Sequence, residues 1–146
     1  MFNREPIYSA LFTRLSGIAG LKTKSRTLKH WNDVPLEQRP ALFMSQSTET
    51  PITTTGEPQK WLLSVDVYVY VQTDGTNPPG TVLNPILDAI EAIFPLHPIT
   101  GKHTLDAPGV EWARIEGTIQ TDEGTLGNQA VAVVPINILA TGGDDV

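Results

Sequence analysis

Cysteine is missing from this 146-residue sequence, so disulfide bonds and thiolate metal sites are excluded. Aromatic residues make up 7% and charged residues 18%, but hydrophobic residues reach 40%, a composition typical of a folded chain. No apolar run approaches the ~20 residues that a membrane helix needs, and the N-terminus lacks the features of a secretory signal. We therefore expect a single domain over residues 1–146, made in a cytoplasm, without a membrane partner.

Positive charge is scarce in the second part of the chain. Residues 61–146 hold two Lys/Arg and eleven Asp/Glu, a net of −9, whereas residues 1–60 hold eight and five, a net of +3. This division fits either two differently solvated faces of one domain or two complementary surfaces on which copies pack head to tail. Nucleic-acid-binding domains are usually basic, and the net charge here is −6. The basic residues Lys22, Lys24, Arg26 and Lys29 therefore indicate a protein contact more than specific binding of nucleic acid.

Two segments have the apolar spacing of an amphipathic helix. The first is predicted over 4–16, with Asn3 as N-cap, Pro6 in the first turn and Gly17 at the end. The second has apolar residues from Leu83 to Phe94; Asn84-Pro85 suits an N-cap and first helical position, although the helix could begin a turn earlier.

Strand patterns fill most of the remaining chain. The clearest is 61–72, where Trp61 and a run of alternate Leu and Val residues form one apolar face. Further strands are expected over 40–46, 110–121 and 129–140, and the last should lie at a sheet edge or bulge because Pro135 cannot donate a hydrogen bond. The order of elements predicts an α+β fold: an antiparallel, possibly mixed, sheet of four to five strands with two α-helices on one face.

Two segments lack these patterns. Residues 48–59 are rich in Thr, Pro and Gly, and are expected to form a long exposed loop, a feature that is often functional. Residues 141–146 are expected to form a flexible C-terminal tail.

Catalytic and metal-binding patterns are weak. The spacing of His97, His103 and Asp106 matches no helical or hairpin arrangement that would place metal ligands together. Glu111 and Glu116 lie an odd number of residues apart on one predicted strand, so they should face opposite sides of the sheet and not act as a catalytic pair. We expect no cofactor, no metal and no enzymatic activity; a small hydrolase or metal-dependent enzyme using the two histidines and Asp106 is the distant alternative.

Several residues are of the types that form protein interfaces. Tyr68 and Tyr70 fall on the face of the 61–72 strand opposite to its valines, and Trp31 and Arg39 flank a predicted turn at 32–35. Trp and Arg are enriched in interface hot spots, although Trp31 could equally cover a small core. The resulting interface hypothesis includes Lys22, Lys24, Arg26, Trp31, Arg39, Tyr68 and Tyr70.

Four short segments, in their order along the chain, resemble the tail terminator proteins of long-tailed, non-contractile bacteriophages. These are TLKHWNDVP at 27–35, QRPALF at 38–43, NPILDAI at 84–90 and AVVPI at 132–136. The resemblance runs from the first predicted helix to the last predicted strand. Neck and tail-completion proteins share the same α+β plan.

The resemblance implies a structural virion protein at the head-proximal end of a phage tail, made in the host bacterial cytoplasm. Its members form a homohexameric ring that caps the tail tube, ends tube polymerisation and offers a head–tail joining surface to the connector protein. DNA passes through the channel without specific binding. Another head–tail connector or stopper, or a tail tube protein, is the alternative within the virion.

Overall fold

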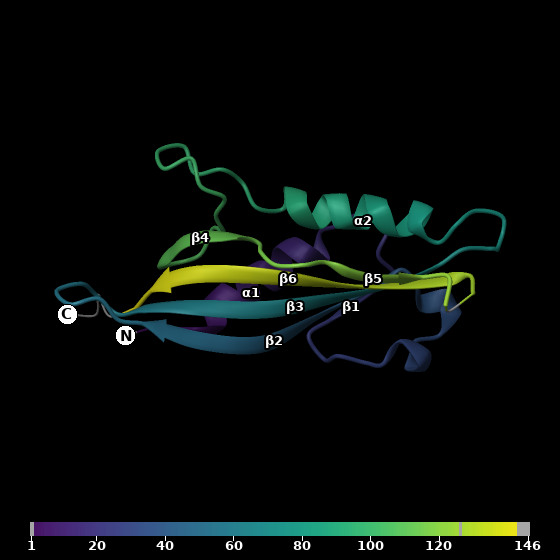
Figure 1. Cartoon of the computed structure of the whole chain (residues 1–146), viewed down its shortest axis with the longest axis horizontal. Helices are drawn as coiled ribbons and strands as arrows, with labels where there is room; N and C mark the ends of the chain where they lie inside the picture. Colours follow the sequence, from purple (N-terminus) through teal and green to yellow (C-terminus); the bar gives the residue numbers. More distant parts are fainter. Residues whose placement is uncertain (1, 126, 143–146) are drawn as a thin grey trace.

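The computed structural model describes residues 2–125 and 127–142, and in this range two α-helices accompany six strands (Figure 1). The elements are α1 (Glu5–Ser16), β1 (Thr23–Ser25), β2 (Ala41–Ile52), β3 (Lys60–Gln72), α2 (Gly80–Ala92), β4 (Val110–Ile115), β5 (Gln120–Glu123) and β6 (Gln129–Thr141). Two short 3-10 helices, Trp31–Asp33 and Leu36–Gln38, lie between β1 and β2.

Both predicted helices are confirmed, with corrections at their N-termini. Helix α1 has a proline in its first turn and ends at Gly17, but Arg4 is its N-cap and provides no side-chain hydrogen bond. Helix α2 begins at Gly80, so Pro85 lies inside the helix instead of at its start. The earlier start extends the apolar face that α2 buries, because Leu83 is packed in the core together with Ile86.

The strand order is β1-β2-β3-β6-β4, and β5 pairs with the same edge of β6 as β4 does. All neighbours are antiparallel except β1 and β2, which are parallel. Figure 1 shows β4 and β5 at opposite ends of β6. The predicted α+β fold with two helices on one face of the sheet is thus confirmed; the sheet has six strands, and it is five strands wide where β1 and β5 flank it and four strands wide where β4 pairs with β6.

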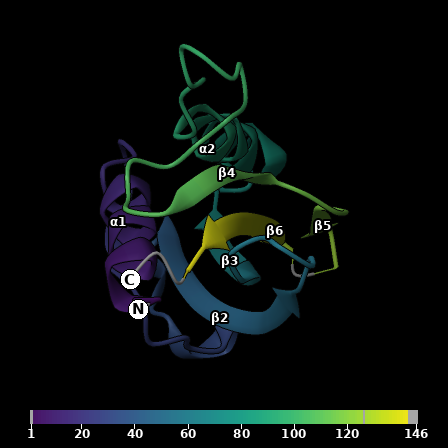
Figure 2. The same cartoon turned by 90° about the vertical axis from the view of Figure 1, so that its left-hand side faces the viewer.

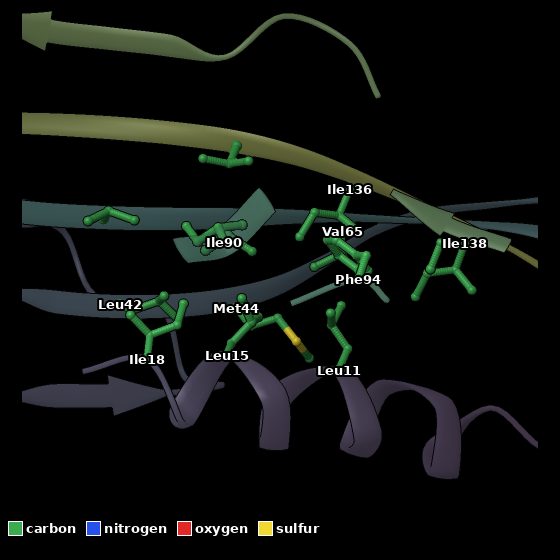
Figure 3. Packing of buried hydrophobic residues seen from close by; sticks show 14 of the residues in the cluster. Leu11, Leu15, Ile18, Leu42, Met44, Val65, Ile90, Phe94, Ile136 and Ile138 are labelled. Carbon is green, nitrogen blue, oxygen red and sulfur yellow. The ribbon is translucent and has the colours of Figure 1, made fainter. Parts of the chain in front are cut away.

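The core lies between the helices and one face of the sheet (Figure 3). Leu11 and Leu15 of α1, together with Ile90 of α2, meet alternate residues of the central strands, including Val65 and Ile136. Burial of an aliphatic side chain of this size contributes about 1.5–3 kcal/mol, so these contacts hold both helices to the sheet. Figure 2 shows α1 near β2, and α2 above the part of the sheet that ends in β4.

Pro135 lies in β6, an interior strand, so of the two positions predicted for it, an edge or a bulge, the edge strand is wrong. It pairs with Asp66 of β3, and its carbonyl accepts a hydrogen bond from the Glu116 backbone N–H at 3.1 Å. The proline nitrogen therefore points to the outer side of β6, at the gap between β4 and β5, where no strand needs a donor. Gly117 opens this gap with φ +113° and divides the single strand predicted over 110–121.

The predicted loop over 48–59 is shorter than expected. β2 continues to Ile52 and pairs with β3 from Lys60, so the loop is 53–59. Residues 48–52 are mostly exposed and polar. They form a strand through backbone pairing with β3, so apolar and polar residues do not alternate there and the sequence gives no strand signal. Of the predicted tail at 141–146, Thr141 closes β6 and the Gly142 N–H donates to the Gln59 carbonyl at 2.9 Å, while 143–146 lie outside the described residues.

Candidate protein–protein interface

The sheet has a second face, opposite the helices, which we call the helix-free face. Side chains alternate along a strand, so the residues between the core valines of β3 point to this face. Its two ends differ. Near β1, the connection at 26–40 folds over the face and buries a second apolar cluster of Val34, Ala41, Phe43 and Tyr70. We call this region the covered end.

Arg39 fastens the connection to the covered end. Its side chain is only 4% exposed and donates to the Val34 carbonyl at 3.1 and 3.3 Å, to the Trp31 carbonyl, and to the Gln129 side-chain oxygen of β6. Burial lowers the pKa of the guanidinium, and these three acceptors compensate for the loss of water around it. Arg39 therefore acts inside the subunit, where it holds the connection at 26–40 to the sheet.

The two predicted interface tyrosines have different surroundings. Tyr70 is 3% exposed, and its hydroxyl donates to the Lys29 carbonyl at 2.6 Å. Burial raises the pKa of Tyr70. Tyr68 stays partly exposed beside the cluster, as does Trp31, whose ring lies against His30 with 5.4 Å between the ring centres. Of these residues, Tyr68 and Trp31 have side-chain surface for a partner, whereas Tyr70 has almost none.

The predicted basic residues lie along the β1 edge of the sheet. Lys24 pairs in register with Leu42, a core residue, and its Nζ donates to the Ser16 carbonyl of α1 at 2.7 Å. Arg26 reaches the same side and forms a salt bridge with Glu5 at 2.6 Å. Lys22 and Lys24 are exposed. Lys22, Lys24 and Arg26 stand at alternate positions in the sequence, so their charges lie on one side of the β1 edge.

The opposite end of the helix-free face has no cover among the described residues. Leu62, Leu139 and Trp112 lie side by side there, on β3, β6 and β4. All three are partly exposed, and the Arg114 guanidinium lies 4.1 Å from the centre of the Trp112 ring. We call this cluster the open end. The sequence places Trp112 on the face that carries Tyr68 and Tyr70, but the predicted set of interface residues includes no residue of the open end.

A polar band separates the two ends. The Ser64 hydroxyl donates to the Asn137 side-chain oxygen at 2.7 Å, and the Asn137 amide donates to Glu116 at 2.8 Å. Arg114 also binds Glu116, at 2.5 Å. The Asn137 hydrogen bond is the main reason why the pKa of Glu116 is lowered, and Arg114 lowers it further. The band joins β3, β6 and β4 by side-chain hydrogen bonds on the solvent side.

Glu111 and Glu116 both face the helix-free side, so the prediction that they face opposite sides is wrong. A register shift between Val110 and Trp112 turns Glu111 toward Thr141, which donates to it, and toward Lys60 at 3.3 Å. The contacts of the two carboxylates on β6, Thr141 and Asn137, are four residues apart, or ~13 Å along the strand. This separation is too long for two carboxylates acting on one bond.

The histidine candidates do not converge. His97 accepts hydrogen bonds from the Ile99 and Thr100 backbone N–H groups and lines a groove with Asp106. His103 lies 3.0 Å from the Phe94 carbonyl and lines a different groove. Within residues 2–125 and 127–142, no group of three His, Asp or Glu side chains is placed to hold a metal ion. The same range contains no helix with the length and apolarity to cross a membrane.

Comparison with known proteins finds likeness in fold. No protein-family model matches the sequence, and no curated protein matches it. A chain of solved structure from the virion of a native gene transfer agent particle is similar, with a TM-score of 0.59 and 9% identity over 95% of this chain and 97% of that chain. A second solved protein, whose name describes no function, has a TM-score of 0.56 and 15% identity over 100% of both chains. At these identities the likeness shows the fold alone.

Proposed function

We propose that this chain is a structural protein of a phage-like virion and acts there as a tail terminator. Copies form a ring on the finished end of the tail tube, end tube polymerisation and present the surface that joins the head connector. The ring has six members in the family that the sequence resembles. DNA crosses its opening without specific binding.

One observation carries this proposal: the fold likeness to a gene transfer agent virion chain spans 95% of this chain and 97% of the other. The two chains therefore correspond as whole units and share more than a common motif. The sequence resemblance at 27–43, 84–90 and 132–136 supports the narrower assignment to a tail terminator.

The described surface has features that suit assembly. The open end leaves Leu62, Leu139 and Trp112 partly exposed in one area, and contiguous apolar surface of this kind often marks a protein contact. The chain also carries a net charge of −6, which disfavours retention of phosphates in a channel that DNA must cross.

The direct test is removal of the chain from the particle that contains it. We expect particles assembled without it to have tails of irregular, extended length and no attached head, and we expect supplied wild-type protein to restore both. Negative-stain electron microscopy measures tail length and head attachment. A variant with Ile99→Ser, at a residue that is 88% exposed, is the matched control and should restore them equally. Normal tails joined to heads without the chain would refute the proposal.

Two other virion roles give different outcomes. A tail tube subunit is expected to polymerise into long tubes by itself, whereas a terminator is not. A head-side stopper is expected to leave tail length unchanged when it is removed and to affect only DNA retention and joining. The same micrographs, with images of the purified protein, separate these roles from the proposed one.

A further inference from the structure

β1 and β5 are the two outermost strands of one row across the sheet. The register runs from Thr23 to Ala41, then Tyr70, Val131 and Asp122, each beside the next. Strands lie about 4.8 Å apart, so the two edges at this level are ~19 Å from each other. Figure 1 shows both strands at the same end of the long central strands.

Both strands have open backbone edges. β1 pairs with β2 and β5 pairs with β6, and neither has a second neighbour in the described part of the chain. An open edge presents unpaired N–H and C=O groups that a strand from another chain can bind. β2 and β6 are both antiparallel to β3 and therefore run in one direction. β1 follows that direction and β5 opposes it, so β1 of one copy and β5 of a second copy, related by rotation about an axis along the strands, are antiparallel.

The two edges carry opposite charge. Lys22 and Lys24 are exposed at the β1 edge. Asp122 and Glu123 are exposed on β5, and Glu91 of α2 lines a groove with Ile119, just before β5. Opposite charges on facing surfaces steer two proteins together and fix their relative position, and like charges keep wrong surfaces apart.

We propose that the basic β1 edge of one copy binds the acidic β5 edge of the next, so that the sheet continues from subunit to subunit. This inference rests on the proposed ring and names the surfaces that form it. The contact is head to tail: each copy uses two different edges, and a suitable rotation closes such a chain of copies into a ring. In a closed ring, neighbouring copies are not shifted relative to each other along the rotation axis, which here lies along the strands. Residues of the same row across the sheet therefore meet at the contact. Thr23 of one copy is therefore expected near Asp122 of the next.

Charge reversal tests the pairing. Lys22→Glu with Lys24→Glu makes both edges acidic, and Glu91→Lys with Asp122→Lys makes both edges basic. Glu123 is left in place because its carboxylate accepts a hydrogen bond from the Gly80 N–H at the start of α2. We expect each double variant alone to lose self-association at least tenfold, and an equimolar mixture to regain it, because acidic-edged and basic-edged copies can alternate. Sedimentation velocity measures association, and circular dichroism verifies the fold.

Matched controls use the same changes away from the edges. Lys102→Glu and Asp106→Lys alter exposed residues in the segment between α2 and β4, and neither should change association. Where the wild-type protein self-associates, edge variants that associate like it, or a mixture that associates no better than its components, make the inference wrong and leave the proposed function unaffected.

A cross-link tests the position of the contact directly, since the chain has no cysteine of its own. A Thr23→Cys, Asp122→Cys double variant is expected to give a ladder of covalent oligomers on oxidation, whereas Thr23→Cys alone should give dimers at most. If the purified protein is monomeric, the double variant is oxidised within assembled particles. Absence of the ladder in particles that contain the chain would overturn the edge pairing, while particles that assemble normally without the chain would overturn the proposed function.

Discussion

The two ends of the helix-free face lie on the same strands, but only one of them is covered by another segment among the described residues. At the covered end, the connection at 26–40 lies over Phe43 and Tyr70, and the buried Arg39 holds it there. At the open end, Leu139 and Trp112 keep part of their surface exposed, with a charged band beside them. An apolar area that a chain seals with its own residues contributes to stability. One that it leaves open is available to a partner.

This contrast separates the residues that hold the subunit together from those available to another virion component, whereas the β1 and β5 edges are proposed to join copies. Substitutions at the covered end should lower the free energy of unfolding, and substitutions at the open end should lower binding to that component. A variant that affected both quantities equally would remove the distinction.

Arg39→Ala should have the largest effect, a loss of about 3 kcal/mol in the free energy of unfolding. The change removes donors from the Val34 and Trp31 carbonyls and from Gln129, and it frees the connection from the sheet. Urea denaturation followed by circular dichroism measures it. Arg39→Lys should recover only part of the loss, because an ammonium cannot reproduce the geometry of the guanidinium.

Arg26→Ala is the control for Arg39→Ala, since Arg26 forms a surface pair with the exposed Glu5. It should change stability by less than about 1 kcal/mol. If Arg39→Ala were as mild as Arg26→Ala but abolished association, Arg39 would be an interface residue, as the sequence suggested, and the covered end would not be sealed by it.

Trp112→Ala should weaken binding of another virion component to the open end at least tenfold, which corresponds to about 1.4 kcal/mol. Trp112 is partly exposed at the open end and packs under Arg114, so its loss removes contact area from the proposed partner surface. Trp31→Ala, at the covered end, is its matched counterpart and should reduce stability instead. Urea denaturation of both variants, and the tail length and head attachment that each restores in particles lacking the chain, give the comparison; equal effects on restoration would contradict it.

Most of the fold can be predicted from the periodic spacing of apolar residues in the sequence. Apolar spacing predicts the two helices and β3, because each buries one face against the core and so repeats every 3.6 or two residues. The sequence signal fails where backbone pairing acts without burial. Residues 48–52 of β2 are exposed, and the separation of β4 from β5 depends on Gly117 and on the proline opposite to it.

The candidate interface is less predictable from the sequence than the fold, because the burial of a polar residue depends on which segment folds over it. Arg39 and Tyr70 are of residue types typical of interfaces, yet both are buried where the connection at 26–40 folds over the sheet. The open end combines residues of β3, β4 and β6, which are up to 77 positions apart, as Leu62 and Leu139 are. No local pattern brings such residues together; only the strand order does.

Tyr70→Phe should cost about 1 kcal/mol of stability, the usual net contribution of one hydrogen bond. It removes the hydroxyl that donates to the Lys29 carbonyl, but keeps the ring against Phe43, where the ring centres are 5.5 Å apart. Tyr68→Phe is the control, since Tyr68 is partly exposed on the same strand. It should change stability by less than about 0.5 kcal/mol. Equal losses would show that the covered end is not held by the hydroxyl of Tyr70.

Glu116→Gln should have the smallest effect, below about 0.5 kcal/mol at pH 7, because the polar band is partly exposed to solvent and its charges are screened. The pKa of Glu116 is lowered in the folded protein by Asn137 and Arg114. The carboxylate therefore contributes fully above the usual glutamate pKa of about 4.3, and the contribution disappears as pH falls through the lower folded value. Urea denaturation at pH 7 and at about pH 3.5 should show a small difference from wild type that decreases in acid. A loss comparable to that of Tyr70→Phe would instead make the band part of the stable core of the subunit, and its neighbours at the open end would then serve folding as much as assembly.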